Sequence, residues 1–227
     1  RAIGVDEVLW QRGHNYLTVV YQIDDECKRL LWVGKDRTIR TLLQFFREFG
    51  TERSAQLRYV CSDMWKAYLK VIAKKASQAI HVLDRFHLEK ALRRACPKYK
   101  APARWRRLHR FLDQSELEKL ALEVWSCGQE GICSRETAMD TIHYLVNNWE
   151  GIEIANDPEH ATGGSCAEGL VGHILSARLS THAMSWSRRG AVKMAALRAF
   201  LVNGGELTSD LFEEPRKQNT TAIPKPS

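Results

Sequence analysis

The chain has 227 residues, of which 44% are apolar and 27% are charged, and its formal net charge is +7. This composition is typical of a globular protein with a sizeable core, and no apolar run approaches the roughly 18 residues that a membrane helix needs, so we expect no membrane association. The surplus of basic residues favours a polyanionic partner such as nucleic acid.

Three runs rich in β-branched and aromatic residues open the chain, at residues 2–9, 16–23 and 29–34. Short polar turns separate these runs, so they are predicted to form an antiparallel meander. Because the chain begins with Arg1 directly before the first strand, we expect it to be a fragment of a longer protein. The six cysteines include no C-x-x-C pair, which argues against a zinc ribbon and favours reduced thiols in the core.

Helices and strands alternate in the next part of the chain. A helix is predicted before Gly50, with an apolar face made of Ile39, Leu42, Leu43, Phe46 and Phe49. A strand at 57–61, a helix at 64–74 and a strand at 79–83 follow. The order predicts an α/β fold, a five-stranded mixed sheet of the ribonuclease-H-like layout, with the first, fourth and fifth strands parallel at its centre.

The remainder is predicted to be helical. Ten Lys and Arg lie between residues 85 and 110, where Glu89 is the only acid. Further helices are predicted at 115–125, 135–149, 165–179 and 190–202, and the polar tail is expected to be disordered. This division predicts a first part of a catalytic core at 1–88, a basic helical insertion at 89–160, closing helices at 161–204 and a disordered tail at 205–227.

Two acids stand at strand positions that the predicted sheet makes neighbours. Asp6 lies within the first strand and Asp63 ends the fourth. Their carboxylates would approach closely, which a cation makes tolerable, and a pair of Mg²⁺ ions about 3.5–4 Å apart that clamps a phosphodiester is the chemistry such clusters support. The alternative is that both are polar strand ends, with Asp63 capping the helix that follows.

Glu168 is the best candidate for a third acid, because it lies in the first turn of a predicted helix after a Gly-Gly loop, where nearby glycines keep the surface open. The alternative is a capping box, Ser165-Cys166-Ala167-Glu168, in which Glu168 only satisfies a backbone N–H group. Rival acids remain in Glu150 and Glu153 for this position, and in Glu7 for that of Asp6.

Asp84 and His87 follow the fifth strand, and each has two interpretations. Asp84 is either a peripheral carboxylate of the cluster or a helix cap, and His87 either contacts a phosphate or packs at a helix start. No P-loop, dinucleotide-binding or nucleophile-elbow motif occurs. We therefore expect no nucleotide cofactor.

The basic region is interpreted as a surface that follows a DNA backbone rather than as a solvated helix face. Trp105, which lies among arginines, favours nucleic acid because bases stack on aromatic rings. A polar stretch with Trp186 is either a second DNA contact or a plain loop. The candidate DNA-binding residues are Arg85, His87, Lys90, Arg93, Arg94, Arg104, Arg106, Arg107, Arg188 and Arg189.

Four motifs in chain order resemble the catalytic core of bacterial insertion-sequence transposases of the DDE type, in the group called ISL-three. They are Gly-Val-Asp-Glu (4–7), Gly-His-Asn-Tyr (13–16), Ser-Asp-Met-Trp-Lys-Ala-Tyr (62–68) and Leu-Asp-Arg-Phe-His-Leu (83–88). The stretch 164–180, with Met-Ser-Trp-Ser (184–187), is similar to a related group, Lre-two, whose members carry a similar Ala-Glu-Gly helix.

The resemblance implies a ribonuclease-H-like, retroviral-integrase-like fold with a helical insertion. It implies that Asp6, Asp63 and Glu168 hold two Mg²⁺ ions, for which Mn²⁺ can substitute, and that the enzyme cleaves DNA at the 3′ ends of an element and joins them to target DNA. Such enzymes act as homo-oligomers on paired ends, in the bacterial cytoplasm at the nucleoid. Two other functions stay open: a ribonuclease-H-like nuclease or resolvase, and an inactive DNA-binding remnant.

Overall fold

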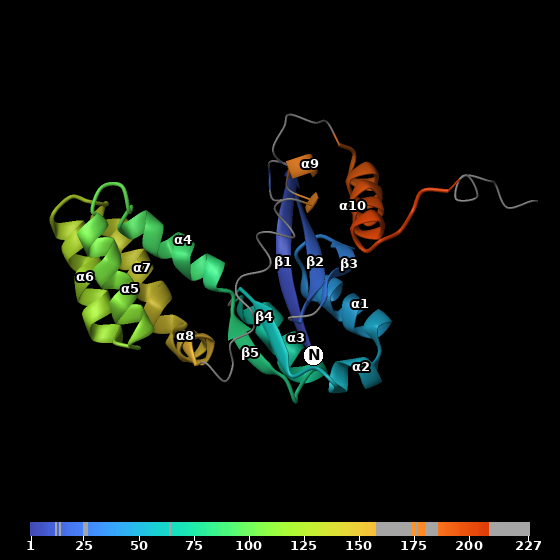
Figure 1. The fold of residues 1–227 in the computed structure, drawn as a ribbon, viewed down its shortest axis with the longest axis horizontal. Helices are drawn as coiled ribbons and strands as arrows, with labels where there is room; N and C mark the ends of the chain where they lie inside the picture. The colour runs from blue at the N-terminus through green and yellow to red at the C-terminus, as the bar shows by residue number, and fades with distance from the viewer. Residues whose placement is uncertain are drawn as a thin grey trace, which may run out of the picture.

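The computed structural model describes residues 1–11, 13, 15–24, 27–63, 65–157, 174–175, 177–179 and 186–208. Its centre is a five-stranded sheet in the order β3-β2-β1-β4-β5 (Figure 1). The strands are β1 (Ala2–Gln11), β2 (Asn15–Asp24), β3 (Cys27–Lys35), β4 (Tyr59–Ser62) and β5 (Ile80–Leu83). The first three form an antiparallel meander, and β4 and β5 extend it in parallel from β1, so the predicted mixed sheet is confirmed.

One face of the sheet is covered by α1 (Ile39–Phe49) and α3 (Lys66–Lys75), with the short α2 (Thr51–Ala55) between them. The hydroxyl of Thr38 caps α1 by accepting a hydrogen bond from the Thr41 N–H group. Gly50 ends the helix with a φ of 88°, which favours glycine. The predicted apolar face is confirmed at Leu42 and Phe46, which are buried, and at Leu43 and Phe49, which pack against the same cluster. Ile39 is 46% exposed instead, and Phe45, which is 2% exposed, packs against the sheet in its place.

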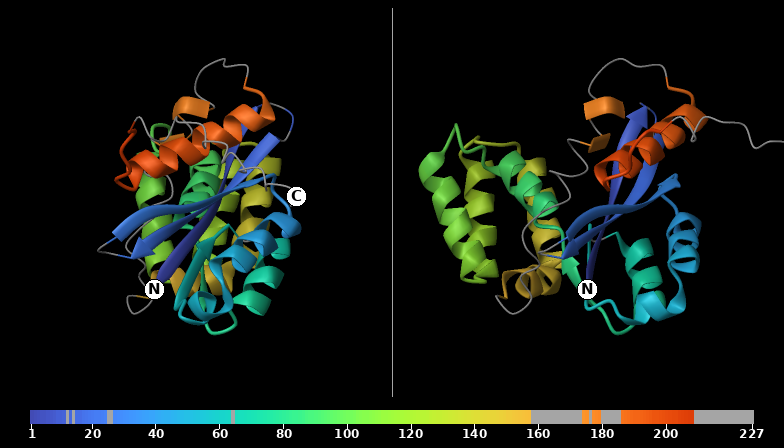
Figure 2. Two further views of the ribbon diagram at one scale, coloured as in Figure 1. Left: turned by 90° about the vertical axis from the view of Figure 1, so that its right-hand side faces the viewer. Right: turned by 45° about the vertical axis from the view of Figure 1, so that its right-hand side comes forward.

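The opposite face packs against α9 (Ala177–Leu179) and α10 (Arg188–Val202) (Figure 2). Ile174, Leu175 and two small residues of α10 contact side chains of β1 and β2 here. The end of α10 is tied to the outer strand, because the carboxamide of Asn203 both accepts from the Leu30 N–H group and donates to the Leu30 carbonyl, at 3.1 and 2.8 Å.

A bundle of helices stands beside the sheet and has a buried cluster of its own (Figure 1). Its members are α4 (Arg85–Ala95), α5 (Pro102–Asp113), α6 (Leu117–Gln129), α7 (Arg135–Asn147) and α8 (Trp149–Asn156). The chain enters the bundle directly from β5 and returns through α8, which packs next to β5. Cys96 and Cys127 are free thiols in this core, as predicted. No helix in the described part of the chain is long and apolar enough to cross a membrane.

Candidate active site

Asp6 lies in β1 and Asp63 directly follows β4, the parallel neighbour of β1, near one end of the sheet. The register pairs Val5 with Ser62, the last residue of β4, so each aspartate is the next residue along its own segment. The Asp6 side chain is 15% exposed and that of Asp63 is 18% exposed, so both are largely shielded from solvent. Two carboxylates in such an environment repel one another unless a cation compensates them.

Glu7 is separated from Asp6 by the alternation of side chains along β1. Ile3 and Val5 pack toward α1 and α3, and Glu7 continues that row. Val8 packs on the face that α10 covers, and Asp6 belongs to that second row. The two rival acids therefore address opposite faces of the sheet.

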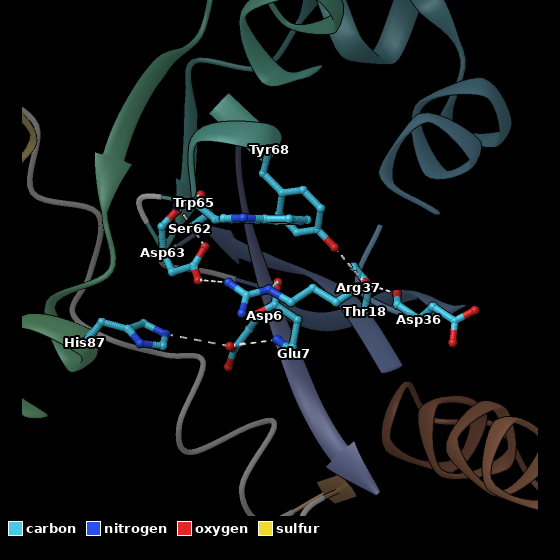
Figure 3. A network of polar contacts seen from close by, with 10 residues as sticks. All are labelled: Asp6, Glu7, Thr18, Asp36, Arg37, Ser62, Asp63, Trp65, Tyr68 and His87. Atoms are coloured by element: carbon cyan, nitrogen blue, oxygen red, sulfur yellow. Dashed lines mark hydrogen bonds and ion pairs between the residues drawn. The ribbon is translucent and has the colours of Figure 1, made fainter. Parts of the chain in front are cut away.

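Arg37 bridges two of the acids (Figure 3). Its Nε atom lies 3.2 Å from Oε1 of Glu7, although at an angle too poor for a hydrogen bond, and its Nη2 atom donates to Oδ2 of Asp63. The guanidinium carbon lies 4.8 Å from the centre of the Trp65 ring, within the range of a cation–π contact. The backbone N–H group of Trp65 donates to Oδ1 of Asp63 at 3.2 Å. This contact lies before α3, whose N-cap is Trp65 and has no side-chain capping bond, so the interpretation of Asp63 as the cap of that helix was wrong.

Glu7 is the most perturbed acid of the site. Its side chain is 8% exposed, and burial raises the pKa of its carboxyl group to about 8, helped by the nearby charges of Asp63 and Asp6 and opposed by Arg37 and His87. A carboxyl group with this pKa is largely protonated at neutral pH. Burial first, and the neighbouring carboxylates second, therefore favour the neutral form of Glu7 at this end of the sheet.

His87 reaches Asp6 from the first turn of α4, with 3.8 Å between Nε2 and Oδ1 (Figure 3). Hydrogen bonding to Asp6 raises the pKa of the His87 imidazole, against the opposing effect of burial. The preceding Asp84 is 1% exposed, and its Oδ1 atom accepts from the Phe86 N–H group at 3.0 Å. The capping interpretation of Asp84 is therefore confirmed, and this cap fixes the helix turn that presents His87.

The backbone that carries Arg37 is held from the sheet. The Thr18 hydroxyl donates to the Asp36 carbonyl at 2.6 Å, so it must accept from the Tyr68 hydroxyl, 2.9 Å away (Figure 3). Burial raises the pKa of Tyr68, which keeps this hydroxyl protonated. The carboxylate of Asp36 pairs with Arg188 of α10, which links the two faces of the sheet beside the site.

The donor set suits a hard divalent cation, because carboxylate oxygens are the preferred ligands of Mg²⁺ and Mn²⁺. Only two of the three predicted ligands can be placed, since Glu168 lies outside the described residues. Among the residues that are described, no group of three or more His, Cys, Asp or Glu side chains is arranged to hold a metal ion. The rival acids Glu150 and Glu153 are exposed on α8.

Several predicted DNA-binding residues are engaged in ion pairs. Arg104 contacts Glu123 of α6 and Glu130, which follows the end of α6. Arg107 also contacts Glu123, at 2.7 Å. The surplus counted between residues 85 and 110 is therefore partly offset by acids from elsewhere in the chain, including Asp113, which pairs with Arg85 at 3.0 Å. The exposed candidates that form no ion pair with another residue in the described part of the chain are Lys90, Arg93, Arg94, Arg106 and Arg189.

Trp105 does not present its ring to a nucleic acid. It is 9% exposed, belongs to the buried cluster of the bundle and lies 4.4 Å from the His109 ring centre. The interpretation of Trp105 as a stacking surface was wrong, because its helical phase points it inward. The arginines around it occupy the outer turns of the same helix.

The sequence analysis did not identify Arg37 as a site residue, because no motif marks it. Only the register of the strands could have shown that it lies near Glu7. Glu7 lies opposite Thr18, and Thr18 lies opposite Gly34. A residue that leaves β3 three positions after Gly34 therefore emerges close to Glu7. The left-handed conformation of Asp36, with a φ of 66°, turns the chain at that point.

Comparison with known proteins assigns a family. A family model described as transposase, of the DDE type and the ISL-three group, matches residues 3–128. A UPF0236 protein of Caldanaerobacter subterraneus is 39% identical over 174 residues, which are 75% of this chain and 36% of that protein. The chain thus spans about a third of the length of such relatives.

Two transposases are similar over the first part of the chain. The transposase for insertion sequence element IS1557 of Mycobacterium tuberculosis is 38% identical over 88 residues, covering 39% of this chain and 19% of that protein. The transposase for insertion sequence element IS1001 of Bordetella parapertussis is 33% identical over 86 residues, or 38% and 21% of the two chains. Together with the model that matches more than half of its length, these relatives show that the chain belongs to the DDE transposase family of the ISL-three group.

Proposed function

We propose that this chain is the catalytic core of an insertion-sequence transposase with a ribonuclease-H-like fold, which cleaves DNA at 3′ ends and transfers them to target DNA. The observation that carries the proposal is the pairing of β1 with β4, which makes Asp6 and Asp63 neighbours. The sheet order β3-β2-β1-β4-β5 agrees with the layout that the fold implies. In this proposal residues 1–88 and 161–204 form the core, and residues 89–160 form the insertion.

Asp6, Asp63 and Glu168 are the proposed ligands of two Mg²⁺ ions. When bound, such ions polarise a phosphodiester and lower the pKa of an attacking water or 3′-hydroxyl group. Asp6 points to the face on which Ile174 and Leu175 pack, and these two residues follow Glu168 by only six and seven positions. This placement supports Glu168, rather than Glu150 or Glu153, as the third ligand.

The chain's other residues would hold and shield the substrate. The Glu7 N–H group donates to Oδ1 of Asp6 at 2.7 Å and so orients this carboxylate, while His87 approaches the same oxygen to 3.8 Å and its pKa is raised by Asp6. The exposed cations of the insertion would contact DNA phosphates, because each neutralised phosphate releases counterions. These contacts position the backbone and carry no sequence information.

The test uses the full chain with supercoiled plasmid and with a short duplex that carries a free 3′-hydroxyl group, in Mg²⁺ or Mn²⁺. We expect nicking of the plasmid and covalent joining of the duplex to it. Asp6→Asn, Asp63→Asn and Glu168→Gln should each lower both activities by about 10³-fold or more, as loss of a catalytic electrostatic group does. Glu150→Gln, an exposed acid on α8, is the matched control and should be unchanged.

Nicking without joined product would instead support a nuclease or resolvase. Equal DNA binding by the wild-type chain and Asp6→Ala, with no cleavage in either cation, would contradict the enzyme and leave a DNA-binding remnant.

A further inference from the structure

A protein cation, the guanidinium group of Arg37, binds the carboxylate of Asp63, which is one of the proposed metal ligands. The Oδ2 atom of Asp63 accepts from Arg37, and the guanidinium group extends on to Glu7, on the face of β1 opposite to Asp6 (Figure 3). The arrangement places one arginine where it neutralises the same carboxylate that a divalent ion would bind.

Positive charge near the acids is scarce. Asp6, Glu7 and Asp63 lie together at 15%, 8% and 18% side-chain exposure, and in the described part of the chain the cationic side chains paired with them are Arg37 and His87. The ion pair of His87 is with Asp6, whereas that of Asp63 is with Arg37, so Arg37 is the cation in direct contact with Asp63. Removing that charge leaves the carboxylate uncompensated, which strengthens its attraction for any other cation.

We propose that Arg37 is a positioning residue that competes with the divalent cation for Asp63, so that cation binding releases Asp63 from the guanidinium group. The inference rests on the proposed function, because the cation is the one assigned to Asp6 and Asp63. Arg37 keeps the site folded and electrically balanced before the cation arrives. Because the cation has to displace the guanidinium group, Arg37 also lowers the affinity of the site for every cation, so that weakly binding ions do not occupy it.

The geometry allows this exchange without a change of fold. The Arg37 side chain is 31% exposed, and its Nε atom makes no hydrogen bond to Glu7, so the guanidinium group is not locked in a bidentate pair. Its backbone neighbour Asp36 is anchored by Thr18. A rotation of the side chain about its own flexible bonds is therefore enough to free Asp63, while Trp65 still offers its ring to the displaced cation.

The alternative is that Arg37 merely orders the carboxylates for the metal, and the two roles predict opposite signs. If Arg37 competes, Arg37→Ala binds Mn²⁺ more tightly than the wild type, by about fivefold for an ion pair of this exposure. If Arg37 only orders the ligands, the same variant binds Mn²⁺ more weakly.

Mn²⁺ binding to the full chain without DNA is measured by electron paramagnetic resonance of the free ion. Arg53→Ala is the matched control, because it removes the same charge far from the acids. Arg53 is an exposed arginine that also lies over an aromatic ring, 5.4 Å from the centre of Phe49. We expect tighter binding for Arg37→Ala, no change for Arg53→Ala, and loss of binding for Asp63→Asn. Unchanged or weaker binding by Arg37→Ala overturns the inference while the proposed function stands.

Absence of Mn²⁺ binding in the wild type, with no effect of Asp63→Asn, instead overturns the proposed function and the inference with it. Should Arg37→Ala fail to fold, Arg37→Gln keeps a hydrogen-bond donor without the charge and should still bind Mn²⁺ more tightly. A measurement on the wild type alone gives the same information: the Nε–H resonance of Arg37 should shift as Mg²⁺ is added, and a resonance that stays constant at saturating Mg²⁺ contradicts the exchange.

Discussion

The end of the sheet and the helical bundle handle charge in opposite ways. At the sheet, acids that are far apart in sequence meet with few cations, and one of them, Glu7, is buried enough for its pKa to rise to about 8. In the bundle, a run of arginines that looks unopposed in sequence is met by acids of another helix, such as Glu123. Tertiary contacts therefore decide which charged side chains have an opposite partner, and the local composition of the sequence predicts this poorly.

The largest expected effect tests whether the bundle depends on packing at Trp105. Trp105→Ala should lower the free energy of unfolding by about 3–5 kcal/mol, because it empties a buried position. Trp125→Ala is the matched control, since Trp125 is 42% exposed on α6 and should cost well under 1 kcal/mol. Chemical denaturation measures both.

DNA binding separates the two interpretations of the same residue. Trp105→Leu keeps an apolar side chain in the core without an aromatic ring and should leave DNA affinity unchanged, whereas a stacking role would lower it. A clear loss of affinity for Trp105→Leu, measured on the folded variant, would restore the discarded interpretation.

The pH dependence of stability sharpens the contrast at the sheet. A folded-state pKa of about 8 against a reference value of 4.5 means that folded Glu7 holds a proton that the unfolded chain has lost. Stability should therefore fall as pH rises from about 4.5 to 8, by at most about 1.4 kcal/mol per pH unit from this group. Glu7→Gln should remove that pH dependence, and above pH 8 the variant should have a higher free energy of unfolding than the wild type.

His87 contributes in the same direction, because its raised folded-state pKa stabilises the protein at low pH and this contribution is lost as pH rises through that pKa. Unfolding curves recorded from pH 5 to 9 for the wild type, Glu7→Gln and the exposed control Glu150→Gln separate the two groups. Identical pH slopes for the wild type and Glu7→Gln would show that Glu7 is ionised in the folded state.

The smallest expected effect concerns the ion pairs of the bundle. Arg104→Ala should cost about 1 kcal/mol, because its side chain is 18% exposed and it contacts Glu123 and Glu130. Arg106→Ala, on the same helix but exposed, should cost close to nothing. A double-mutant cycle with Glu123→Gln gives the coupling directly, and zero coupling would mean that Arg104 is free to bind DNA.

Much of the sheet was predictable from sequence because period-2 apolar runs and the polar breaks between them are local signals. The adjacency of Asp6 and Asp63 followed from strand order alone, since parallel neighbours carry the next residue at the same level. The role of Asp84 was left open between two interpretations because a cap and a ligand use the same side chain, and only the contact to Phe86 decides.

Other features depend on long-range contacts that local patterns do not contain. Arg37 reaches the acids from a turn between β3 and α1, and its partners lie about 30 positions away in either direction. The buried face of α1 was predicted correctly except at Ile39 and Phe45, because an apolar residue in the first turn can lie beyond the sheet that the helix covers. The third acid, Glu168, lies outside the described residues, and its place in the site stays a prediction.

The edge strand β3 is paired on its outer side with a single side chain, the carboxamide of Asn203. An unpaired strand edge offers its N–H and C=O groups to any other chain that can form a ladder with it. At Leu30 both groups are already taken by this single side chain. The end of α10 thereby blocks this edge of the sheet, so a strand of a neighbouring molecule could pair with β3 at Leu30 only after the Asn203 side chain had moved away.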